Sequence, residues 1–536
     1  MSRFRVLVAD KIALDGLGPL ANDPAFELIE RPSLKGAELA AALADVDAIL
    51  VRSATKITRA SLAGGSRLKV IGRAGVGVDT IDVEAATERG VAVMNAPAGN
   101  TISAAELACA LLLTLIRRVS AADRSMKAGE WDRTSFSGTE LYRKTLGLIG
   151  AGRVGGEVAR RARAFGMRVM AYDPFLSAEA ARQLEIELGA LDDVLAAADV
   201  ISLHVPLTDS TRGLIGPAQL RRLRRGAVVI NAARGGVLDE AALMEALTSG
   251  HLAGAALDVF DEEPLPADHP LRKLPNIVLT PHLGASTEEA QLNVAVEIAE
   301  SVRAALLEGD YSRAVNASLV GGDRLRRLKP VLDLAIRLGR LAAACVDGAV
   351  TGVEVRFAGE GDDLLRPLAA GAMIGLLESV SGEAAVNTVN ALHLAKQRGI
   401  QVDRTRLDMA GDYADLVELK VAAGGKTLRV AGALLAEGHP RIVRLDDFRV
   451  DLVPRGLLLV LRNRDVPGVI GRVGTILGAA GVNIAEYHQA RLAAGGEALA
   501  AVSVDSKLPL GVLTDLRALP EVHSAVQVDL EGTATA

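Results

Sequence analysis

Three short stretches of this 536-residue chain carry side chains that could oxidise an alcohol. Arg234 lies in the sequence NAARGG, Glu263 in LDVFDEEP and His282 in TPHLGAST, and each stretch follows an apolar run of strand length. Oxidation of an alcohol needs a base for the hydroxyl proton, a cation for an acidic substrate and an acceptor for the hydride. A His beside a carboxylate can be that base, and an Arg can hold a carboxylate. Taken singly, Arg234 also fits a surface ion pair, Glu263 a solvated turn, and His282 a core or surface histidine.

The stretch from Lys144 to Pro174 supplies a candidate site for the hydride acceptor. An apolar run precedes the motif G-x-G-x-x-G, formed by Gly150, Gly152 and Gly155, and a helical pattern, a second apolar run and Asp173 follow it. Glycines at this spacing permit a tight turn, close approach of a pyrophosphate and close packing of helix on strand. The N-terminus of the helix attracts phosphate. The pattern predicts a dinucleotide site, and the alternative is a glycine-rich turn in a non-binding α/β domain.

The acidic residue selects between the two nicotinamide cofactors. Asp173 follows Gly150 at close to the spacing of about 20 residues that the motif requires. A carboxylate there accepts hydrogen bonds from ribose hydroxyls and repels a 2′-phosphate. The next residues are Pro174, Phe175 and Leu176, so no Arg follows directly to hold such a phosphate. The sequence therefore favours NAD over NADP.

Length and composition restrict the class of protein. A chain of 536 residues predicts three or four domains, and 50% hydrophobic with 24% charged residues is typical of soluble globular proteins. A net charge of −6 gives no reason to expect nucleic-acid binding. The two cysteines, Cys109 and Cys345, lie in apolar helical patterns and form no disulfide framework, which fits a reducing compartment. The most apolar run, Leu107–Ile116, is too short to cross a bilayer, and no signal peptide or metal site is visible. We expect a cytoplasmic protein.

Alternating strand and helix patterns place the three stretches on two α/β domains. In the first, strands are expected at Phe4–Ala9, Ala48–Val51, Lys69–Ile71 and Val91–Met94. In the second, strands beyond the glycine motif are expected at Val200–His204, Ala227–Asn231, Gly254–Val259 and Ile277–Thr280. A helix over Thr101–Ser120 would cross between them, and a helix over Ser286–Leu307 would return. We predict a substrate domain of residues 1–98 and 290–318, and a Rossmann domain of residues 99–289, with a ligand cleft between them.

The C-terminal part predicts two further domains. Residues 319–455 combine a helix over Arg324–Val346 with several strands, which defines an α+β domain. The strands are expected at Gly352–Phe357, Ala385–Asn390, Leu416–Val421, Thr427–Val430 and Ile442–Leu452. Residues 456–536 give the order βαββαβ, which is typical of a ferredoxin-like unit.

The order of the four motifs resembles the D-2-hydroxyacid dehydrogenases, and the whole chain resembles their long form with two C-terminal regulatory domains. The resemblance implies a flavodoxin-like substrate domain, His282 as acid/base, Glu263 as its carboxylate partner and Arg234 as the anchor of the substrate's carboxylate and carbonyl. It also implies an NAD site formed by Gly150, Gly152, Arg153, Val154, Gly155, Asp173, Ala232, Ala233, Arg234, Asp258, His282, Leu283, Gly284 and Ala285.

Two sequences of the first domain, VRSAT and GRAGVGVD, match substrate-domain loops of the same family. The resemblance implies that Arg52, Ser53 and Asn100 bind a phosphate. It also implies that backbone N–H groups near Gly75 and Val76 bind the carboxylate. The expected reaction is the oxidation of 3-phospho-D-glycerate to 3-phosphohydroxypyruvate, the first step of L-serine biosynthesis.

Two other functions stay open at this point. One is another enzyme of the family, such as a glyoxylate or hydroxypyruvate reductase; a formate dehydrogenase pairs its His with Gln rather than Glu. The other is a non-enzymatic NAD-sensing protein like the corepressors of this fold, which lack the C-terminal tail. The resemblance also implies a homodimer or homotetramer, with Arg133 as a candidate for contact across the subunit interface.

The last domain resembles an ACT domain, which binds effectors in amino-acid biosynthesis. The resemblance rests on the sequences NRDVPG and GVNI. In relatives that bind L-serine, the positions of Asn463, Asp465 and Asn483 hold it between paired domains, although a His or aromatic residue often replaces Asn463. Arg441 and Arg444 of the preceding domain are either solvated charges or part of an anion site.

Overall fold

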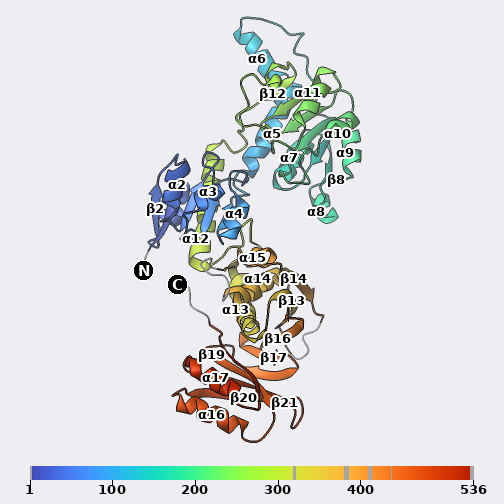
Figure 1. Ribbon diagram of the computed structural model, residues 1–536. Helices are drawn as coiled ribbons and strands as arrows, with labels where there is room; N and C mark the ends of the chain where they lie inside the picture. Colours follow the sequence, from blue (N-terminus) through green and yellow to red (C-terminus); the bar gives the residue numbers. More distant parts are fainter. Residues whose placement is uncertain are drawn as a thin grey trace.

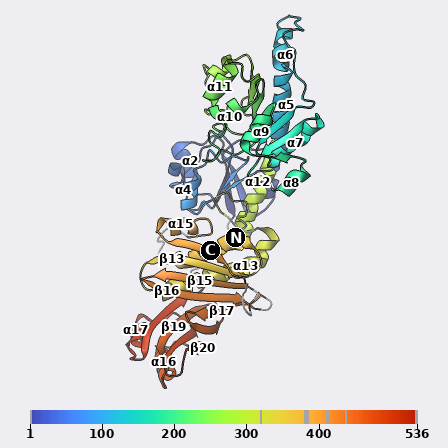
Figure 2. The same cartoon turned by 90° about the vertical axis from the view of Figure 1, so that its right-hand side faces the viewer.

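The computed structural model describes residues 3–317, 321–378, 386–408, 413, 415–435 and 438–531. Four sheets, each packed against helices, follow one another along an elongated molecule (Figures 1 and 2). The predicted boundary between residues 318 and 319 lies outside the described residues. In the part of the chain that the structure describes, no helix is long and apolar enough to cross a membrane.

The first sheet is parallel, with the flavodoxin-like order β2-β1-β3-β4-β5. Its strands are β1 (Phe4–Val8), β2 (Phe26–Glu30), β3 (Ala48–Val51), β4 (Val70–Arg73) and β5 (Ala92–Asn95). Helices α2 (Gly36–Leu43), α3 (Arg59–Leu62) and α4 (Val83–Glu88) pack on one face, and α1 (Gly18–Ala21) with α12 (Glu288–Glu308) packs on the other. The strand β2 was not predicted, because it lies at the edge of the sheet and is largely solvated.

The return of the chain to this sheet is confirmed. Helix α12 contributes Val294, Ile298 and Val302 to the same core as the first sheet. Gly72 allows the close approach, since a Cβ there would lie 2.9 Å from Cγ1 of Ile298. The first unit is therefore built from the N-terminal strands together with α12, which follows the second sheet in the chain.

The second sheet is also parallel, with the order β12-β11-β10-β9-β6-β7-β8. Its strands are β6 (Thr145–Ile149), β7 (Arg168–Tyr172), β8 (Glu187–Leu188), β9 (Val200–Leu203), β10 (Val228–Asn231), β11 (Gly254–Leu257) and β12 (Ile277–Leu279). Helices α5 (Thr101–Ile116) and α7 (Arg153–Ala164) cover one face, and α9 (Leu191–Ala197), α10 (Pro217–Arg222) and α11 (Glu240–Thr248) cover the other. Helix α8 (Ala178–Gln183) precedes β8. The strand order reverses between β6 and β9, where doubly wound sheets bind ligands.

The predicted helix over Thr101–Ser120 is shorter than expected. Helix α5 ends at Ile116, Arg118 takes a left-handed conformation with φ 51°, and α6 (Val119–Lys127) begins after it. The break falls where the apolar pattern stops: α5 contributes apolar residues to a core, whereas α6 has no buried residue.

The third sheet is mixed, with the order β14-β13-β15-β16-β17-β18. Its strands are β13 (Val350–Ala358), β14 (Gln401–Arg406), β15 (Asp415–Ala423), β16 (Lys426–Leu434), β17 (Pro440–Leu445) and β18 (Phe448–Leu452). Helices α13 (Gly322–Cys345), α14 (Leu365–Leu377) and α15 (Ala391–Gln397) share its core. The edge strand β14 was not predicted, because its residues are mostly solvated.

Two strand predictions in this unit were wrong. Residues 386–390, the described part of the strand expected at Ala385–Asn390, form a loop in which the side chain of Asn387 accepts hydrogen bonds from the N–H groups of Val389 and Asn390. The side chain satisfies backbone donors that a strand would have paired. The single strand expected at Ile442–Leu452 is the hairpin β17–β18, because Asp446 takes a left-handed conformation with φ 50°.

The fourth sheet is antiparallel, with the order β20-β21-β19-β22. Its elements are β19 (Leu457–Arg464), α16 (Val469–Ala479), β20 (Ile484–Arg491), β21 (Glu497–Val504), α17 (Leu510–Ala518) and β22 (Val522–Asp529). This is the predicted βαββαβ order, and the predicted fold class is confirmed. Both helices cover one face of the sheet, while the other face packs against the third unit.

A half-buried histidine under the glycine motif links pH to stability. A Cβ at Gly150 would lie 2.6 Å from the carbonyl oxygen of His204, and Nε2 of His204 lies 2.8 Å from Oγ of Ser202. Desolvation of the ring lowers the pKa of His204 from 6.5 to about 4. The folded second unit therefore favours the neutral ring.

We expect acid to destabilise this unit through His204. Between pH 6.5 and about 4 the unfolded chain binds a proton that the folded ring does not, so the free energy of unfolding falls as the pH is lowered. The loss amounts to at most about 3 kcal/mol. Thermal unfolding followed by circular dichroism should show a smaller acid shift for His204→Asn than for the parent and for His523→Asn, a control at an exposed histidine. Equal acid shifts in all three proteins would contradict this prediction.

Candidate active site

The glycine turn after β6 is shaped to receive a dinucleotide. Gly150 has φ +90°, and a Cβ at Gly155 would lie 2.3 Å from the carbonyl oxygen of Gly150, so the helix packs against the turn. Apart from its neighbours in the chain, no atom of the described residues lies within 4 Å of a Cβ built at Gly152, which leaves room above the backbone. Gly152 is the N-cap residue of α7 and has no side chain that could accept a hydrogen bond from the first turn of the helix. The backbone N–H groups of this first turn, which begins with Arg153 and Val154, are therefore available to a phosphate.

Asp173 lies at the end of β7, beside the same turn. Its Oδ2 accepts a hydrogen bond from the N–H of Ala151 at 2.8 Å, and its Oδ1 accepts one from the N–H of Phe175 at 2.9 Å. The carboxylate therefore fixes the glycine turn against the second strand, where an adenosine ribose would lie in a dinucleotide fold. These residues fit the NAD that the sequence predicts.

His282 and Glu263 form a direct pair. Nδ1 of His282 lies 2.7 Å from Oε2 of Glu263, and Oε1 of Glu263 accepts a hydrogen bond from the N–H of Phe260 at 3.1 Å. Burial by itself would raise the pKa of the Glu263 carboxyl, but the hydrogen bond and charge of His282, aided by Phe260 and Arg234, bring this pKa below its ordinary value. The carboxylate thus orients the ring, and Nε2 of His282 has no hydrogen-bond partner within the described chain.

Asp258 holds the turn that carries His282. Its side chain is wholly buried, and it accepts hydrogen bonds from Oγ1 of Thr280 at 2.6 Å, from the N–H of Leu283 at 2.7 Å and from the N–H of Gly284 at 3.0 Å. The N–H of His282 donates to the carbonyl oxygen of Asp258 at 2.9 Å. Burial raises the pKa of Asp258 in spite of these donors. The sequence predicted a cofactor contact at Asp258, and the geometry gives this carboxylate a positioning role.

Arg234 lies on a loop that packs directly against the segment of Glu263. The side chain of Asn231 fixes the loop, because it donates to the carbonyl oxygen of Arg234 at 3.0 Å and accepts from the N–H of Ala233 at 3.1 Å. A Cβ at Gly235 would lie 1.9 Å from the carbonyl oxygen of Phe260, so only glycine fits between the two segments. The three motifs found in the sequence therefore meet at one edge of the sheet.

Arg234 also reaches across to the first unit. Its Nε lies 3.4 Å from Oδ2 of Asp79, and a Cβ at Gly77 would lie 2.3 Å from its Nη2. The loop that contains Gly75 and Val76 therefore lies against Arg234, as the predicted substrate site requires. The two parallel units are bridged at this point by a cation and a carboxylate.

Of the other predicted substrate residues, Arg52 and Ser53 lie on the first unit and Asn100 lies at the start of α5. The N–H of Arg52 donates to Oδ2 of the buried Asp10, its Nη1 donates to the carbonyl oxygen of Lys11 at 3.1 Å, and Ser53 follows on the exposed loop. Oδ1 of Asn100, at the start of α5, is buried without a hydrogen-bond partner in the described chain. An unpaired buried acceptor is costly and is typical of a site that a ligand completes.

Arg73 was not predicted as a site residue, although it belongs to the same cluster. Burial, together with the charges of Arg52 and Arg234, lowers the pKa of Arg73 to about 10, and its Nε is buried without a partner among the described residues. Arg73 is the last residue of β4. Its position at the end of a parallel strand is the signal that identified Arg234, and it could have identified Arg73 as well.

Within one chain the structure does not bring the three predicted effector residues together. Asn463 and Asp465 flank the last residue of β19, whereas Asn483 directly precedes β20 at the other end of the same sheet. Strands of this length separate the two ends by roughly 25 Å. Asn463 is buried, Asp465 accepts from Nη1 of Arg491 at 3.3 Å, and Asn483 donates to Oδ2 of Asp505 at 2.7 Å.

Comparisons with known proteins define first the class of this protein. The NAD binding domain of the D-isomer specific 2-hydroxyacid dehydrogenases matches residues 109–284. A solved glyoxylate reductase from Paecilomyes thermophila is 31% identical, with a TM-score of 0.54 over 59% of this chain and 99% of its own. The two parallel units are thus those of an NAD-dependent 2-hydroxyacid dehydrogenase.

The C-terminal half and the full-length relatives define the particular family. The D-3-phosphoglycerate dehydrogenase intervening domain matches residues 327–446. D-3-phosphoglycerate dehydrogenase of Bacillus subtilis is 41% identical over 98% of this chain and 100% of its own length, and that of Mycobacterium tuberculosis is 42% identical over 99% and 100%. The chain belongs to the D-3-phosphoglycerate dehydrogenases, NAD-dependent oxidoreductases of serine biosynthesis.

We expect Asp258→Asn to reduce turnover while the affinity for NADH changes little. An amide presents a donor where the carboxylate accepts from Leu283 and Gly284, so the turn of His282 shifts, and a shift of about 1 Å can cost about a hundredfold in rate. The kcat should fall by that order, and fluorescence titration should give a similar Kd for NADH. Asp268→Asn, on an exposed loop, is the control. A large loss of NADH affinity with unchanged kcat would assign Asp258 to the cofactor instead.

Proposed function

We propose that the cleft between the two parallel units oxidises 3-phospho-D-glycerate to 3-phosphohydroxypyruvate. The observation that supports this substrate is the cluster of Arg52, Arg73 and Arg234, which act on each other's charge from two sides of the cleft. Three guanidinium groups at close quarters repel one another and suit a ligand with both a phosphate and a carboxylate. In this proposal the phosphate lies near Arg52, Ser53 and Asn100, and the carboxylate lies near Arg234 and the loop of Gly75.

The proposed reaction proceeds by removal of a proton and a hydride from C2 of the substrate. Nε2 of His282 takes the hydroxyl proton as the C2–H bond breaks with its electron pair and the C2–O bond becomes a carbonyl. The carboxylate of Glu263 keeps the ring in place and stabilises the imidazolium that forms. The guanidinium of Arg234 holds the carboxylate and the developing carbonyl oxygen. NAD, when bound, supplies the acceptor for the hydride.

The proposed NAD site comprises the glycine turn and the three strand-end loops. The pyrophosphate would lie over Gly152 at the start of α7, and Asp173 would bind the adenosine ribose. The nicotinamide end would lie near Ala232, Ala233 and the segment from His282 to Ala285. The four-domain division at residues 98, 289, 318 and 455 stays part of this proposal.

We further propose a homo-oligomer. Helix α6 has no buried residue within the chain, and Met126 and Trp131 are 52% and 79% exposed. Apolar side chains gathered at one protruding segment favour contact with a second copy, in which Arg133 would take part.

L-serine would bind between paired C-terminal units, because a second chain could bring its Asn483 to the Asn463 and Asp465 of the first. The proposed location is the cytoplasm, which suits the free thiols of Cys109 and Cys345.

The role of His282 can be tested by its removal. We expect His282→Ala to lower kcat by at least a thousandfold, because no other group within the described site is placed to take the proton, and to leave the Kd for NADH nearly unchanged. Stopped-flow or steady-state NADH formation measures the first quantity, and fluorescence titration measures the second. His251→Ala, at a histidine of the same unit away from the cleft, is the control. Retention of more than a few per cent of the activity would show that another residue is the base.

The substrate can be tested by NADH oxidation with 3-phosphohydroxypyruvate, glyoxylate and 2-oxoglutarate in parallel. We expect a strong preference for the phosphorylated acid. Arg73→Ala should raise the KM for this acid by about tenfold or more and that for glyoxylate much less, because a charged hydrogen bond contributes about 1.5–3 kcal/mol. Arg31→Ala, at an exposed residue of the same unit, is the control. A preference for glyoxylate would indicate a glyoxylate reductase instead. Each assay repeated with L-serine tests the proposed effector.

A further inference from the structure

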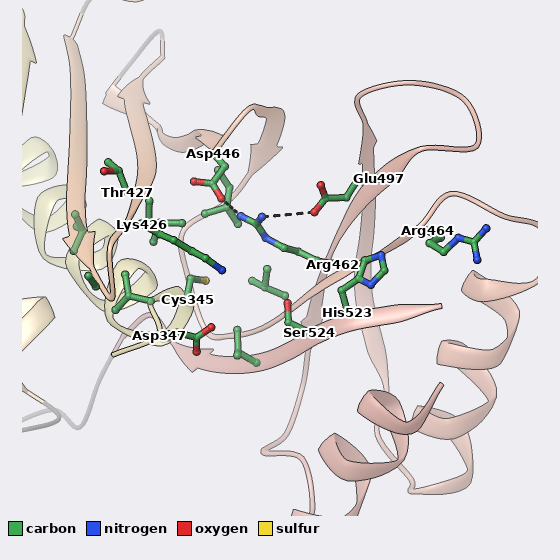
Figure 3. Close-up of a pocket in the computed structure, with 18 of the residues that line it drawn as sticks. Cys345, Asp347, Lys426, Thr427, Asp446, Arg462, Arg464, Glu497, His523 and Ser524 are labelled. Atoms are coloured by element: carbon green, nitrogen blue, oxygen red, sulfur yellow. Dashed lines mark ion pairs between the residues drawn. The ribbon is translucent and has the colours of Figure 1, made fainter. Parts of the chain in front are cut away.

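A second pocket, of about 700 Å³, lies far from the dehydrogenase cleft, where the third and fourth units meet (Figure 3). The third unit contributes the end of α13 with Asp347, the start of β16 with Lys426, and Asp446 on the β17–β18 turn. The fourth unit contributes Arg462, Arg464, Glu497, His523 and Ser524. None of the residues predicted for catalysis, NAD, substrate or L-serine lines this pocket.

The pocket brings charged side chains into an interface that is otherwise mainly apolar. Along β19, side chains alternate between the two faces of the sheet. Leu458 and Val460 face the third unit and are buried in its core, and the same face continues with Arg462 and Arg464. Within one strand, the side chains that face the third unit thus change from buried aliphatic groups to guanidinium groups. Apolar side chains at these two positions would have made burial of the interface more favourable in free energy.

The charges that line the pocket are only partly paired. Arg462 forms ion pairs with Asp446 across the interface and, at 3.6 Å, with Glu497 of its own unit. Lys426, Arg464 and Asp347 are exposed and have no ion-pair partner among the described residues. In Figure 3, the ammonium group of Lys426 points into the pocket, and Asp347 lies on the same side of the pocket as Lys426. Two unpaired cations and one unpaired anion therefore border the same space, and the third unit contributes one of each, Lys426 and Asp347.

The charge pattern restricts the class of ligand. The lining balances three carboxylates against three cationic side chains, so a simple anion would also meet the carboxylates and a simple cation would also meet the cations. A molecule with one positive and one negative group can pair with both Asp347 and Lys426 and leaves the charge of the pocket unchanged. Cys345 adds no charge, because burial raises the pKa of its thiol to about 12.

We propose that this pocket binds a free α-amino acid, with its ammonium group on Asp347 and its carboxylate on Lys426 and Arg462. The hydroxyl groups of Thr427 and Ser524 and the ring of His523 then face the side chain of the ligand, which favours a polar one. This site is separate from the proposed L-serine site, since it is formed within one chain and uses none of the same residues.

Binding of an amino acid in this pocket would change the contact between the third and fourth units. The ion pair between Arg462 and Asp446 joins them, and a ligand carboxylate competes with Asp446 for the same guanidinium. Binding therefore loosens one contact and adds another that involves Lys426 of the third unit and Arg462 of the fourth. The C-terminal unit would respond to the ligand without any change in the dehydrogenase cleft itself.

The test is isothermal titration of the full chain with L-serine, L-threonine, L-asparagine, L-glutamine, L-aspartate and L-glutamate. We expect saturable binding of at least one of them, and a loss of about tenfold or more in affinity for Lys426→Gln and for Asp347→Asn, since each removes one charged hydrogen bond. The matched controls Lys396→Gln and Asp515→Asn, at exposed residues of the third and fourth units, should bind like the parent. Propionate and ethylamine, which each carry only one of the two charges, should not bind.

Three outcomes would overturn the proposal: no saturable binding of any of these amino acids up to about 10 mM, full affinity in both pocket variants, or equal binding of propionate. Asn483→Ala separates the two sites, because it removes binding between paired C-terminal units and leaves the pocket intact. The readout is heat of binding rather than turnover, so failure here is distinguishable from failure of the proposed dehydrogenase mechanism.

Discussion

The dehydrogenase site depends on the buried carboxylate of Asp258. One side chain accepts three hydrogen bonds from the turn after β12, and its carbonyl oxygen accepts a fourth from His282. This fixes His282 in a left-handed conformation with φ 57°, where its Nδ1 reaches Glu263. The buried charge is tolerated because every donor around it is used. The fold itself therefore positions the proposed acid/base pair.

Around that turn, the proposed substrate site is divided between two units. The NAD-binding unit presents His282, Glu263 and Arg234, and the first unit presents the loops of Arg52 and Arg73. The ion pair between Arg234 and Asp79 is the electrostatic contact that joins these groups across the cleft. Since like charges gather there, an anionic substrate stabilises the arrangement rather than disturbing it.

In the C-terminal half, charged side chains also lie where two folded units meet. The bare face of the last sheet is sealed against α13 by aliphatic residues, and the seal ends at Arg462. The guanidinium of Arg462 with two carboxylates forms one polar part of the contact between the two units, and Arg340 of α13, which donates to the carbonyl oxygen of Leu530 at 2.9 Å, forms another. Both halves of the molecule thus have paired charges where two folded units meet. A ligand that binds at such a contact can change the relative positions of the two units at a small cost in free energy.

The sequence by itself determined the local features of this protein. The glycine spacing, the acid after the second strand and the polar residues at strand ends follow from backbone geometry and were readable one by one, as were most helices and strands. The edge strand β14, the loop of Asn387 and the hairpin at Asp446 were not predicted, because their conformations depend on contacts with residues outside the local sequence. Only the tertiary structure decided that Asp258 faces a turn, that Arg73 joins two other arginines and that Lys426 and Asp347 border one pocket. Burial and long-range electrostatics assign those roles, and both arise from contacts between residues far apart in the chain.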